Sequence, residues 1–263
     1  MSPPTSSKLA VVTGASAGIG AALVRELSRA GRPVLAVARR ADRLGALADE
    51  ARAAGGAEVH PLALDLGADG AAERVRDAAH ALGNAAWLVN DAGFGAYGRF
   101  ERQDARRLSE MVRVNCEALV LLTHALLPDL RASGEGVVLN VASAAAFQPT
   151  PYMSLYGATK AFVLSFSEGL AEELRGAGVL VAAFCPGPVA TEFGAVAGVG
   201  ARFARVPAVL SAEEAARAAL AQVRRREVVH VPTMVYRLTS EVPRLLPRGV
   251  IRRISGMVHQ EEP

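Results

Sequence analysis

The chain has few lysines and few cysteines, and both shortages narrow the classes of protein to which it can belong. Of its 29 lysine and arginine residues, only Lys8 and Lys160 are lysines. The two cysteines, Cys116 and Cys185, do not have the spacing of metal ligands, and the five histidines are scattered along the chain. We therefore expect no metal site, and two reduced cysteines in the core of a cytosolic protein.

Long apolar runs and leader sequences are missing as well. No uncharged apolar stretch reaches the ~18 residues that a membrane-spanning helix needs. The Ser/Pro-rich start, residues 1–7, has no apolar core of the kind found in signal peptides. With a net charge of +3 and no basic run of the nucleic-acid-binding type, a nucleic-acid partner is not expected. The sequence thus predicts a cytoplasmic protein with a disordered lead-in at residues 1–7.

A buried strand, a glycine-rich turn and a helix open the folded part of the chain. Leu9–Thr13 is apolar and rich in β-branched residues, and residues 21–30 have helical periodicity. Between them, Gly14, Gly18 and Gly20 follow the spacing G-x-x-x-G-x-G. Glycine lets the backbone approach a ligand closely, and the free N–H groups at a helix start suit a diphosphate. The turn therefore indicates a dinucleotide site, although it is not the commonest fingerprint, G-x-G-x-x-G.

The end of the second strand suggests which dinucleotide would bind. The apolar residues 33–38 are followed directly by Arg39 and Arg40. In a βαβ dinucleotide unit this position reaches the adenosine ribose, where an acidic residue would hold a free 2′-hydroxyl. Arginine instead matches a 2′-phosphate by charge and by its forked donors. The pair favours NADP over NAD, unless both arginines merely solvate the loop before a helix at residues 41–54.

Strands and helices alternate along the rest of the chain. We expect further strands at residues 57–64, 86–90, 136–141, 179–184 and 228–231, and helices at residues 70–83, 101–127, 154–176 and 211–225. The strands are almost entirely apolar, as expected when both faces of a sheet are covered. This pattern predicts an α/β fold with a doubly wound, Rossmann-like parallel sheet of about seven strands, in a single domain over residues 8–232. Pro128 is expected to end the helix at 101–127, and residues 191–209 to form a mobile loop or short helices.

Tyr156 and Lys160 are the strongest sign of catalysis. Residues four apart lie on one face of a helix, so a phenol and an ammonium lie side by side here. A tyrosine titrates near ~10, and a neighbouring cation favours the phenolate and lowers that pKa. Such a pair can give a proton to an oxygen or take one from it. Taken alone, Tyr-x-x-x-Lys also occurs on any half-exposed amphipathic helix.

Several motifs in this order make the chain resemble the short-chain dehydrogenase/reductase family over about residues 8–232. They are Thr13-Gly14-x-x-x-Gly18-x-Gly20, Asn90-x-Ala92-Gly93, Asn115, Ser143, Tyr156-x-x-x-Lys160 and Pro186-Gly187. The resemblance implies that Tyr156 is the general acid/base and that Lys160 lowers its pKa and holds the nicotinamide ribose. It also implies that Ser143 binds the substrate oxygen and that Asn115 anchors a water in a proton relay.

The expected cofactor contacts follow from the glycine turn, the two arginines and this resemblance. They are Gly14, Ser16, Gly18, Ile19, Gly20, Arg39, Arg40, Asp65, Asn90, Ala92, Gly93, Tyr156, Lys160, Pro186, Gly187, Val189 and Thr191. Asp65 would lie near the adenine, and Pro186, Gly187 and Thr191 beside the nicotinamide. One residue departs from the family pattern, since Asp91 stands where Asn-Asn-Ala-Gly has its second asparagine. An ionised carboxylate cannot donate hydrogen bonds, which puts the bonding around the fourth strand in question.

The substrate is less well specified by the sequence. Mostly apolar residues lie near the site in motif order, namely Phe94, Tyr97, residues 144–147, Tyr152, Pro188 and Phe193. They suggest a hydrophobic carbonyl compound or alcohol, although ordinary core and loop packing explains the same residues. With Ser143, Tyr156 and Lys160 all retained, we expect an NADP-dependent oxidoreductase. The alternative is a protein of the same fold that senses NADP(H) without turnover.

The last residues, 233–263, form a basic extension. Residues 236–258 contain five arginines and one glutamate, a net charge of +4, so the rest of the chain sums to −1. Val250, Ile251, Ile254, Met257 and Val258 fall on one helical face. A basic amphipathic helix can lie on an anionic membrane surface. It can equally pack on its own domain or on a second subunit of the homo-oligomer that we expect.

Overall fold

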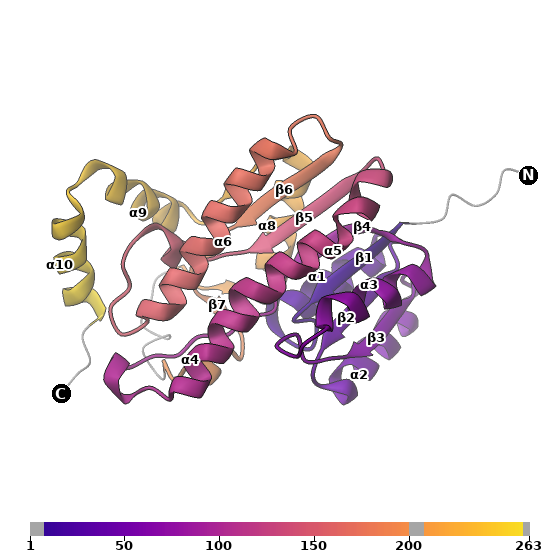
Figure 1. The fold of residues 1–263 in the computed structure, drawn as a ribbon, viewed down its shortest axis with the longest axis horizontal. Helices are drawn as coiled ribbons and strands as arrows, with labels where there is room; N and C mark the ends of the chain where they lie inside the picture. Colours follow the sequence, from indigo (N-terminus) through magenta and orange to yellow (C-terminus); the bar gives the residue numbers. More distant parts are fainter. Residues whose placement is uncertain (1–7, 200–207, 260–263) are drawn as a thin grey trace, which may run out of the picture.

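Seven parallel strands form one central sheet, with helices on both faces (Figure 1). The computed structural model describes residues 8–199 and 208–259. The strands of this sheet are β1 (Leu9–Thr13), β2 (Val34–Ala38), β3 (Val59–Ala63), β4 (Ala85–Asn90), β5 (Gly136–Val141), β6 (Val179–Phe184) and β9 (Val229–His230). Their order is β3-β2-β1-β4-β5-β6-β9, and every neighbouring pair is parallel. The predicted doubly wound sheet in a single domain is confirmed.

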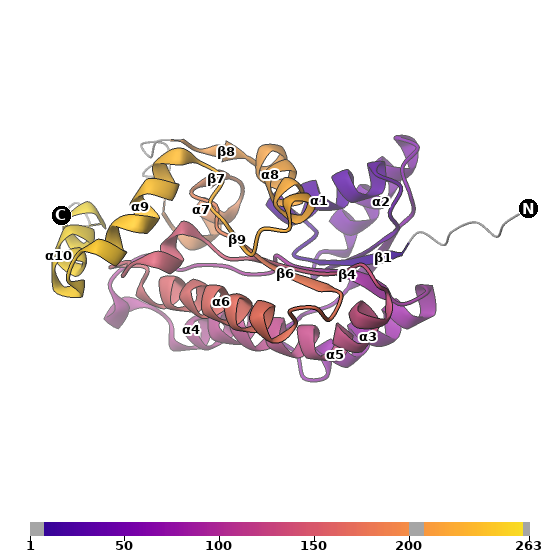
Figure 2. The same cartoon turned by 90° about the horizontal axis from the view of Figure 1, so that it is seen from above.

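The helices complete a three-layer arrangement (Figure 2). They are α1 (Gly18–Arg29), α2 (Ala41–Ala53), α3 (Ala71–Leu82), α4 (Ala105–Val112), α5 (Ala118–Ala132), α6 (Ser154–Glu173), α7 (Phe193–Ala197), α8 (Ala212–Arg225), α9 (Met234–Leu245) and α10 (Arg248–His259). Helices α1, α2 and α8 cover one face of the sheet, and α3, α5 and α6 cover the other. Alternate residues of a strand therefore enter different cores: Val12 packs with the first group and Val11 with the second.

The order of the strands determines where a ligand can bind. From β1 the chain first builds outward through β2 to β3, and it then returns to the other side of β1 to build β4, β5 and β6. The connections therefore diverge between β1 and β4. In an open parallel sheet, ligands bind at such a switch point, outside the carboxyl ends of the strands. The glycine turn after β1 and residues 91–93 after β4 both lie there.

The helix predicted at residues 101–127 differs from the structure, because Pro128 does not end it. Helix α4 continues through a π-helical turn, Arg113–Glu117, into α5, which contains Pro128. A proline inside a helix removes one backbone hydrogen bond. Leu122, Leu126 and Leu130 are buried against the sheet, before and after the proline. Their burial keeps the helix intact, so the prediction of a stop at Pro128 was wrong.

Two short strands outside the main sheet fix the segment after β6. β7 (Val189–Ala190) pairs in parallel with β8 (Leu210–Ser211), which leads into α8. Ser211 caps α8 in the predicted way, since its hydroxyl accepts from the Glu214 N–H and the Glu214 carboxylate accepts from the Ser211 N–H. Within the predicted loop at 191–209, residues 193–197 form the short helix α7. Residues 200–207 lie outside the described part of the chain.

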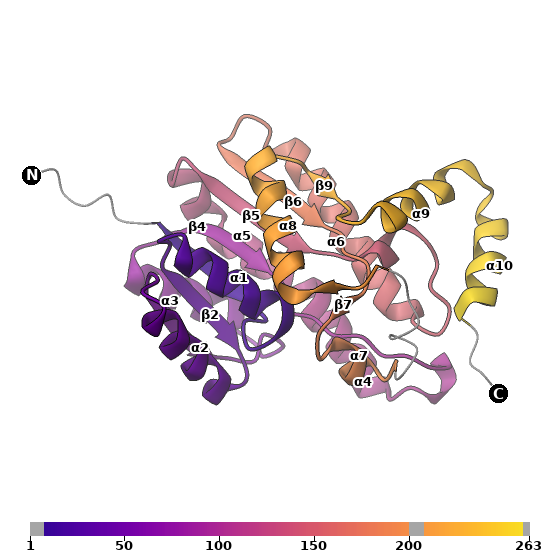
Figure 3. The ribbon, with the colours of Figure 1, turned by 180° about the vertical axis from the view of Figure 1, so that it is seen from behind.

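Helices α9 and α10 form an arm at the end of the molecule farthest from the N-terminus (Figure 3). The amphipathic helix predicted near residues 250–258 corresponds to α10, whereas α9 was not predicted. The arm is attached to the body mainly through α9. The ring of Tyr236 lies so close to Gly187 that a Cβ on this glycine would sit 2.3 Å from it.

One helix in the described residues is long and apolar enough to span a membrane by length and composition. It is the continuous segment Ala105–Ala132, made of α4, the π-helical turn and α5. Leu122 and Leu126 of this helix pack on the sheet, whereas Val112 and Leu121 are exposed. The expectation from the sequence rested on uncharged runs and did not include such a segment, and the packing of its buried side on the sheet explains it as a helix of the domain.

Candidate active site

A cavity of about 1150 Å³ opens at the carboxyl ends of the strands. Most of the residues predicted to bind a cofactor or to act in catalysis line it. They are Gly14, Ser16, Gly18, Ile19, Arg39, Arg40, Asp65, Ala92, Gly93, Ser143, Tyr156, Lys160, Pro186, Gly187, Val189 and Thr191. Gly20, Asn90 and Asn115 lie behind this lining. Residues from seven separate segments thus meet in one place, as the switch point of the sheet requires.

The glycine turn has the shape that the sequence predicted. Gly14 and Gly18 have φ of +69° and +55°, which side chains rarely allow. A Cβ on Gly20 would lie 2.6 Å from the Gly14 carbonyl oxygen. Helix α1 starts with no side-chain cap and no acidic residue in its first turn. The first N–H groups of α1 can therefore serve an anionic ligand.

The two arginines after β2, Arg39 and Arg40, differ in exposure and in their contacts. Arg39 is exposed at the cavity wall. Arg40 donates from Nε to Ser16 Oγ at 3.1 Å and from a terminal nitrogen to Glu192 Oε2 at 2.8 Å. Arg43 also binds Glu192, and the two arginines hold the pKa of its carboxyl below its ordinary value. Glu192 was missed by sequence reasoning, because about 150 residues separate it from Arg40 and no local pattern links them.

Ser143 and Tyr156 bring their hydroxyl groups together. Ser143 ends the stretch after β5 and caps a short 3-10 turn, accepting from the Ala145 N–H at 3.1 Å. The phenol of Tyr156 lies close enough to the Ser143 side chain for the serine to act on its pKa in the lowering direction. Gly157, the next residue of α6, packs against Thr150, since a Cβ there would lie 2.0 Å from the Thr150 hydroxyl. The site therefore presents two adjacent hydroxyl groups to the cavity.

Lys160 lies beneath Tyr156, as the four-residue spacing predicts. Its Nζ is 5.9 Å from the centre of the Tyr156 ring and donates to the Val141 carbonyl at 2.7 Å. Only 7% of the residue is exposed. Burial lowers the pKa of Lys160, and the nearby Asp91 carboxyl is the main group acting in the opposite direction.

The expected lowering of the tyrosine pKa is not found in this structure. Burial raises the pKa of the Tyr156 phenol to about 12, the Ser143 side chain acts in the lowering direction, and Asp91 raises it further. Desolvation of the phenolate is the largest of these effects, and Lys160, 5.9 Å from the ring centre, is not among the groups that shift this pKa. At neutral pH the phenol therefore keeps its proton.

Asn115 lies in the π-helical turn, a feature that often marks functional sites. Its Oδ1 accepts from the Phe94 N–H at 3.1 Å, and its Nδ2 donates to the Phe94 carbonyl at 3.0 Å and to Thr159 Oγ1 at 3.0 Å. The side chain thus ties the loop after β4 to the helix that carries Tyr156. Its predicted role in a proton relay stays a prediction.

With Asp91 in place of the second asparagine, β4 keeps most of its hydrogen bonds, but the buried Asn90 Oδ1 has no partner among the described residues. Asn90 donates to Asn140 Oδ1 at 2.9 Å and to Thr123 Oγ1 at 3.2 Å, so its side chain points into the core. Its cofactor contact therefore remains untested. The main-chain N–H of Asp91 donates to Thr13 Oγ1 at 3.1 Å, and its carboxyl lies against the backbone of Gly20, where a Cβ would be 2.7 Å from Oδ2. Burial raises the pKa of Asp91 to about 7, and Lys160 acts in the lowering direction.

The part of the cavity beyond Tyr156 is largely apolar. Of the residues expected near a substrate, Phe94, Tyr97, Ala144, Ala145, Pro188 and Phe193 line it. The Tyr156 and Phe193 rings lie 5.1 Å apart between centres. The arm adds residues that were not expected, among them Tyr236, Val242, Ile251 and Ile254. No spacing rule connects the arm to the catalytic motifs, which explains why they were missed.

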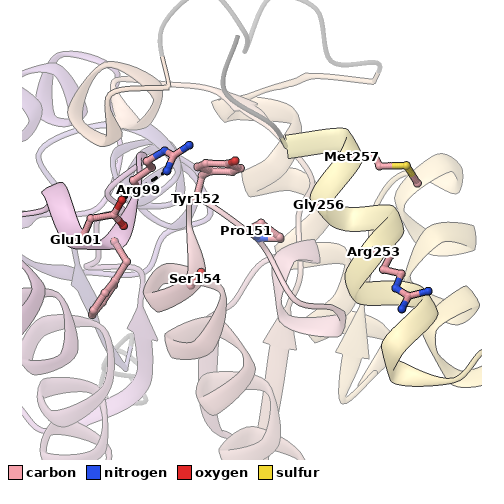
Figure 4. A pocket seen from close by; sticks show the side chains of 9 residues that line it. Arg99, Glu101, Pro151, Tyr152, Ser154, Arg253, Gly256 and Met257 are labelled. Atoms are coloured by element: carbon pink, nitrogen blue, oxygen red, sulfur yellow. Dashed lines mark ion pairs between the residues drawn. The ribbon is translucent and has the colours of Figure 1, made fainter. Parts of the chain in front are cut away.

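A second cavity, of about 630 Å³, lies beside the first, between the body and α10 (Figure 4). Tyr152, one of the expected substrate residues, lines this cavity instead. Arg99 and Glu101 lie on the body side, and Arg253 and Met257 project from α10 on the other. The cavity therefore separates the C-terminal half of α10 from the body.

The comparisons with known proteins agree with this site. A family model described as short chain dehydrogenase matches residues 8–200. The chain therefore belongs to the short-chain dehydrogenase/reductase family. It is 40% identical over 191 residues to a short chain dehydrogenase of Pseudocercospora fijiensis, a match that covers 72% of this chain and 62% of that protein. The chain thus spans less than two thirds of this relative's length.

Two solved structures are similar over nearly the whole chain. A short-chain dehydrogenase from Sphingobium yanoikuyae in complex with NADPH is 32% identical, with a TM-score of 0.81 and coverage of 97% of this chain and 98% of that chain. The bulky-bulky ketone specific alcohol dehydrogenase from Comamonas testosteroni is 29% identical, with a TM-score of 0.77 and coverage of 97% and 95%. Both matches include the region of the arm, which the family model does not reach.

Proposed function

We propose that the protein is an NADP(H)-dependent oxidoreductase that interconverts a hydrophobic ketone and its alcohol, with Tyr156 as the general acid/base. The observation that carries this proposal is the meeting of Ser143, Tyr156 and Lys160 in one cavity with the glycine turn. An ordinary amphipathic helix does not account for a buried Lys160, or for Ser143 and Tyr156 in the same cavity as a dinucleotide-type turn.

The residues of the cavity fit NADP(H). The uncapped start of α1 suits the diphosphate, and the exposed guanidinium of Arg39 suits the 2′-phosphate. Lys160 and the segment at Pro186 and Gly187 would hold the nicotinamide end. The NADPH in the Sphingobium yanoikuyae relative supports this choice. Arg40 is already engaged by Glu192, so we assign the phosphate contact to Arg39 in the first place.

The proposed chemistry is reduction of a carbonyl group. When bound, NADPH supplies the hydride that the carbonyl carbon receives. The hydroxyl of Ser143 donates a hydrogen bond to the carbonyl oxygen, where negative charge develops. Tyr156 transfers its proton to that oxygen and regains one from solvent, which completes the alcohol. A phenol that keeps its proton at neutral pH suits this direction.

The apolar wall around the catalytic pair supports a hydrophobic substrate. Phe94, Phe193 and Val242 approach from three different segments and leave room for groups on both sides of a carbonyl. The ketone specificity named for the Comamonas testosteroni relative is consistent with this proposal. Cytoplasmic location and homo-oligomer formation remain predictions from the sequence.

A panel of ketones and aldehydes with NADPH tests the proposal. We expect loss of NADPH absorbance with bulky apolar ketones, and little with small polar aldehydes. Ser143→Ala should bind NADPH normally and lose most of this activity. If NADPH binds tightly but no member of the panel is reduced, the protein is a sensor of the cofactor rather than an enzyme.

A further inference from the structure

The arm formed by α9 and α10 exposes an apolar stripe on the side that faces away from the body. Met234, Leu238 and Leu245 lie within about 40° of one another around α9, from its ~100° rotation per residue, and 66%, 62% and 82% of their surfaces are exposed. Ser240 lies on the opposite side of the helix and is buried. The stripe therefore does not contribute to the packing of α9 on the protein.

Helix α10 adds less to this surface. Ile251 and Ser255 are buried and attach the helix to the molecule, and Ile254, although partly exposed, lines the large cavity. Met257 lines the second cavity, which lies between the C-terminal half of α10 and the body (Figure 4). Val250 is exposed and lines neither cavity. The exposed apolar surface of the arm is therefore mainly the stripe of α9, to which α10 adds Val250.

Positive charge surrounds these apolar residues. Arg237, Arg248, Arg252 and Arg253 are exposed on the arm, and Glu241 is the acidic residue of α9 and α10. Residues 236–258 carry a net charge of +4, while the whole chain carries +3. The charge of the protein is therefore concentrated at the end where the apolar side chains are exposed.

We propose that the arm binds peripherally to an anionic lipid bilayer, with the stripe of α9 in the interface and the arginines against the lipid headgroups. An anionic bilayer supplies both an apolar interior and a negative surface. A second copy of the chain fits less well. A two-fold contact through the arm would bring the same basic surface of both subunits together.

The position of the cavity is consistent with such docking. Val242 of α9 and Ile251 and Ile254 of α10 belong to the wall of the large cavity. A docked arm would hold the substrate end of this cavity close to the bilayer. An apolar substrate dissolved in the membrane could then enter without crossing much water. This consequence rests on the proposed function, whereas the docking itself does not.

Flotation of the full chain with vesicles tests the proposal. We expect binding to vesicles of phosphatidylcholine with phosphatidylglycerol at low salt, weaker binding at high salt, and little binding to phosphatidylcholine alone. Leu238→Glu with Leu245→Glu should weaken binding at least ~10-fold. Arg248→Glu with Arg252→Glu should weaken binding by a similar factor or more, because each basic residue near an anionic surface contributes about 1 kcal/mol to binding. None of these four residues lines the large cavity, so NADPH affinity should stay unchanged.

Matched controls lie at the other end of the molecule. Leu82→Glu, at the end of α3, adds one negative charge at another exposed leucine and is compared with Leu238→Glu alone. Arg175→Glu, just after α6, reverses one exposed arginine and is compared with Arg248→Glu alone. Both should bind vesicles as the parent does. The proposal fails if the parent ignores anionic vesicles at low salt, or if the arm variants float as well as the controls. It also fails if Leu238→Glu only converts an oligomer into smaller species by light scattering, since a second copy then covers the stripe.

Discussion

The carboxyl group of Asp91 should make the stability of this protein depend on pH in a way that one substitution removes. The carboxyl of Asp91 lies against Gly20 at the start of α1 and near Lys160 and Tyr156. Although the residue keeps some surface toward the cavity, its carboxyl is enclosed, and burial raises its pKa from 3.8 to about 7. The folded protein thus holds a proton that the unfolded chain releases near pH 4.

The sign and size of the effect follow from proton linkage. Between pH 4 and pH 7 the folded state binds one more proton than the unfolded state, so this contribution to stability falls as pH rises and is fully lost above pH 7. Each pH unit corresponds to 1.36 kcal/mol. From pH 5 to pH 8 the free energy of unfolding therefore falls by at most about 3 kcal/mol. For a chain of this size this corresponds to a fall in Tm of ~6–12 °C.

Asp91→Asn keeps the size of the side chain and one oxygen, and it cannot ionise. We expect the Tm of the variant relative to the parent to rise by several degrees between pH 5 and pH 8. Asp69→Asn, in the exposed turn before α3, controls for the loss of one carboxyl and should follow the parent. A gap between the Asp91 variant and the parent that is equal at the two pH values would refute the reasoning.

Two further substitutions test the binding of the cofactor. The parent should bind NADPH at least ~10-fold more tightly than NADH, or ~1.4 kcal/mol. Arg39→Ala should shrink that ratio while Arg102→Ala, an exposed arginine away from the cavity, should not; equal dissociation constants for the two cofactors in the parent would contradict the assignment. Lys160→Arg keeps the charge in a wider group that cannot occupy the same buried position against the Val141 carbonyl. It should both lose turnover and weaken NADPH binding, and unchanged binding by titration would mean that Lys160 does not hold the cofactor.

The features that were predicted correctly depend on local geometry. Apolar runs of this length prefer buried strands, and glycines at this spacing allow a tight turn at the start of a helix. Both preferences are local, so the sheet and the dinucleotide-type turn could be predicted. The four-residue spacing of Tyr156 and Lys160 placed them on one face of α6 for the same reason. The cap of α8 at Ser211 is equally local.

The features that were missed depend on packing between distant segments. Pro128 remains inside α5 because leucines on both sides of it are buried. Glu192 reaches Arg40 only because the chain after β6 folds back over the cavity. The pKa of Tyr156 is raised rather than lowered because the phenol is buried, and burial cannot be read from the spacing of two residues.

The most direct test of the account is a single-turnover measurement with Tyr156→Phe. Phenylalanine keeps the ring that packs against Phe193 but removes the phenol beside Ser143. The glycine turn and Arg39 are untouched, so NADPH should bind within a few-fold of the parent. With a ketone that the parent reduces, oxidation of bound NADPH should slow by the ~10²–10⁴ typical of a lost acid/base group. A rate close to that of the parent would contradict the account, because the proton would then come from another group.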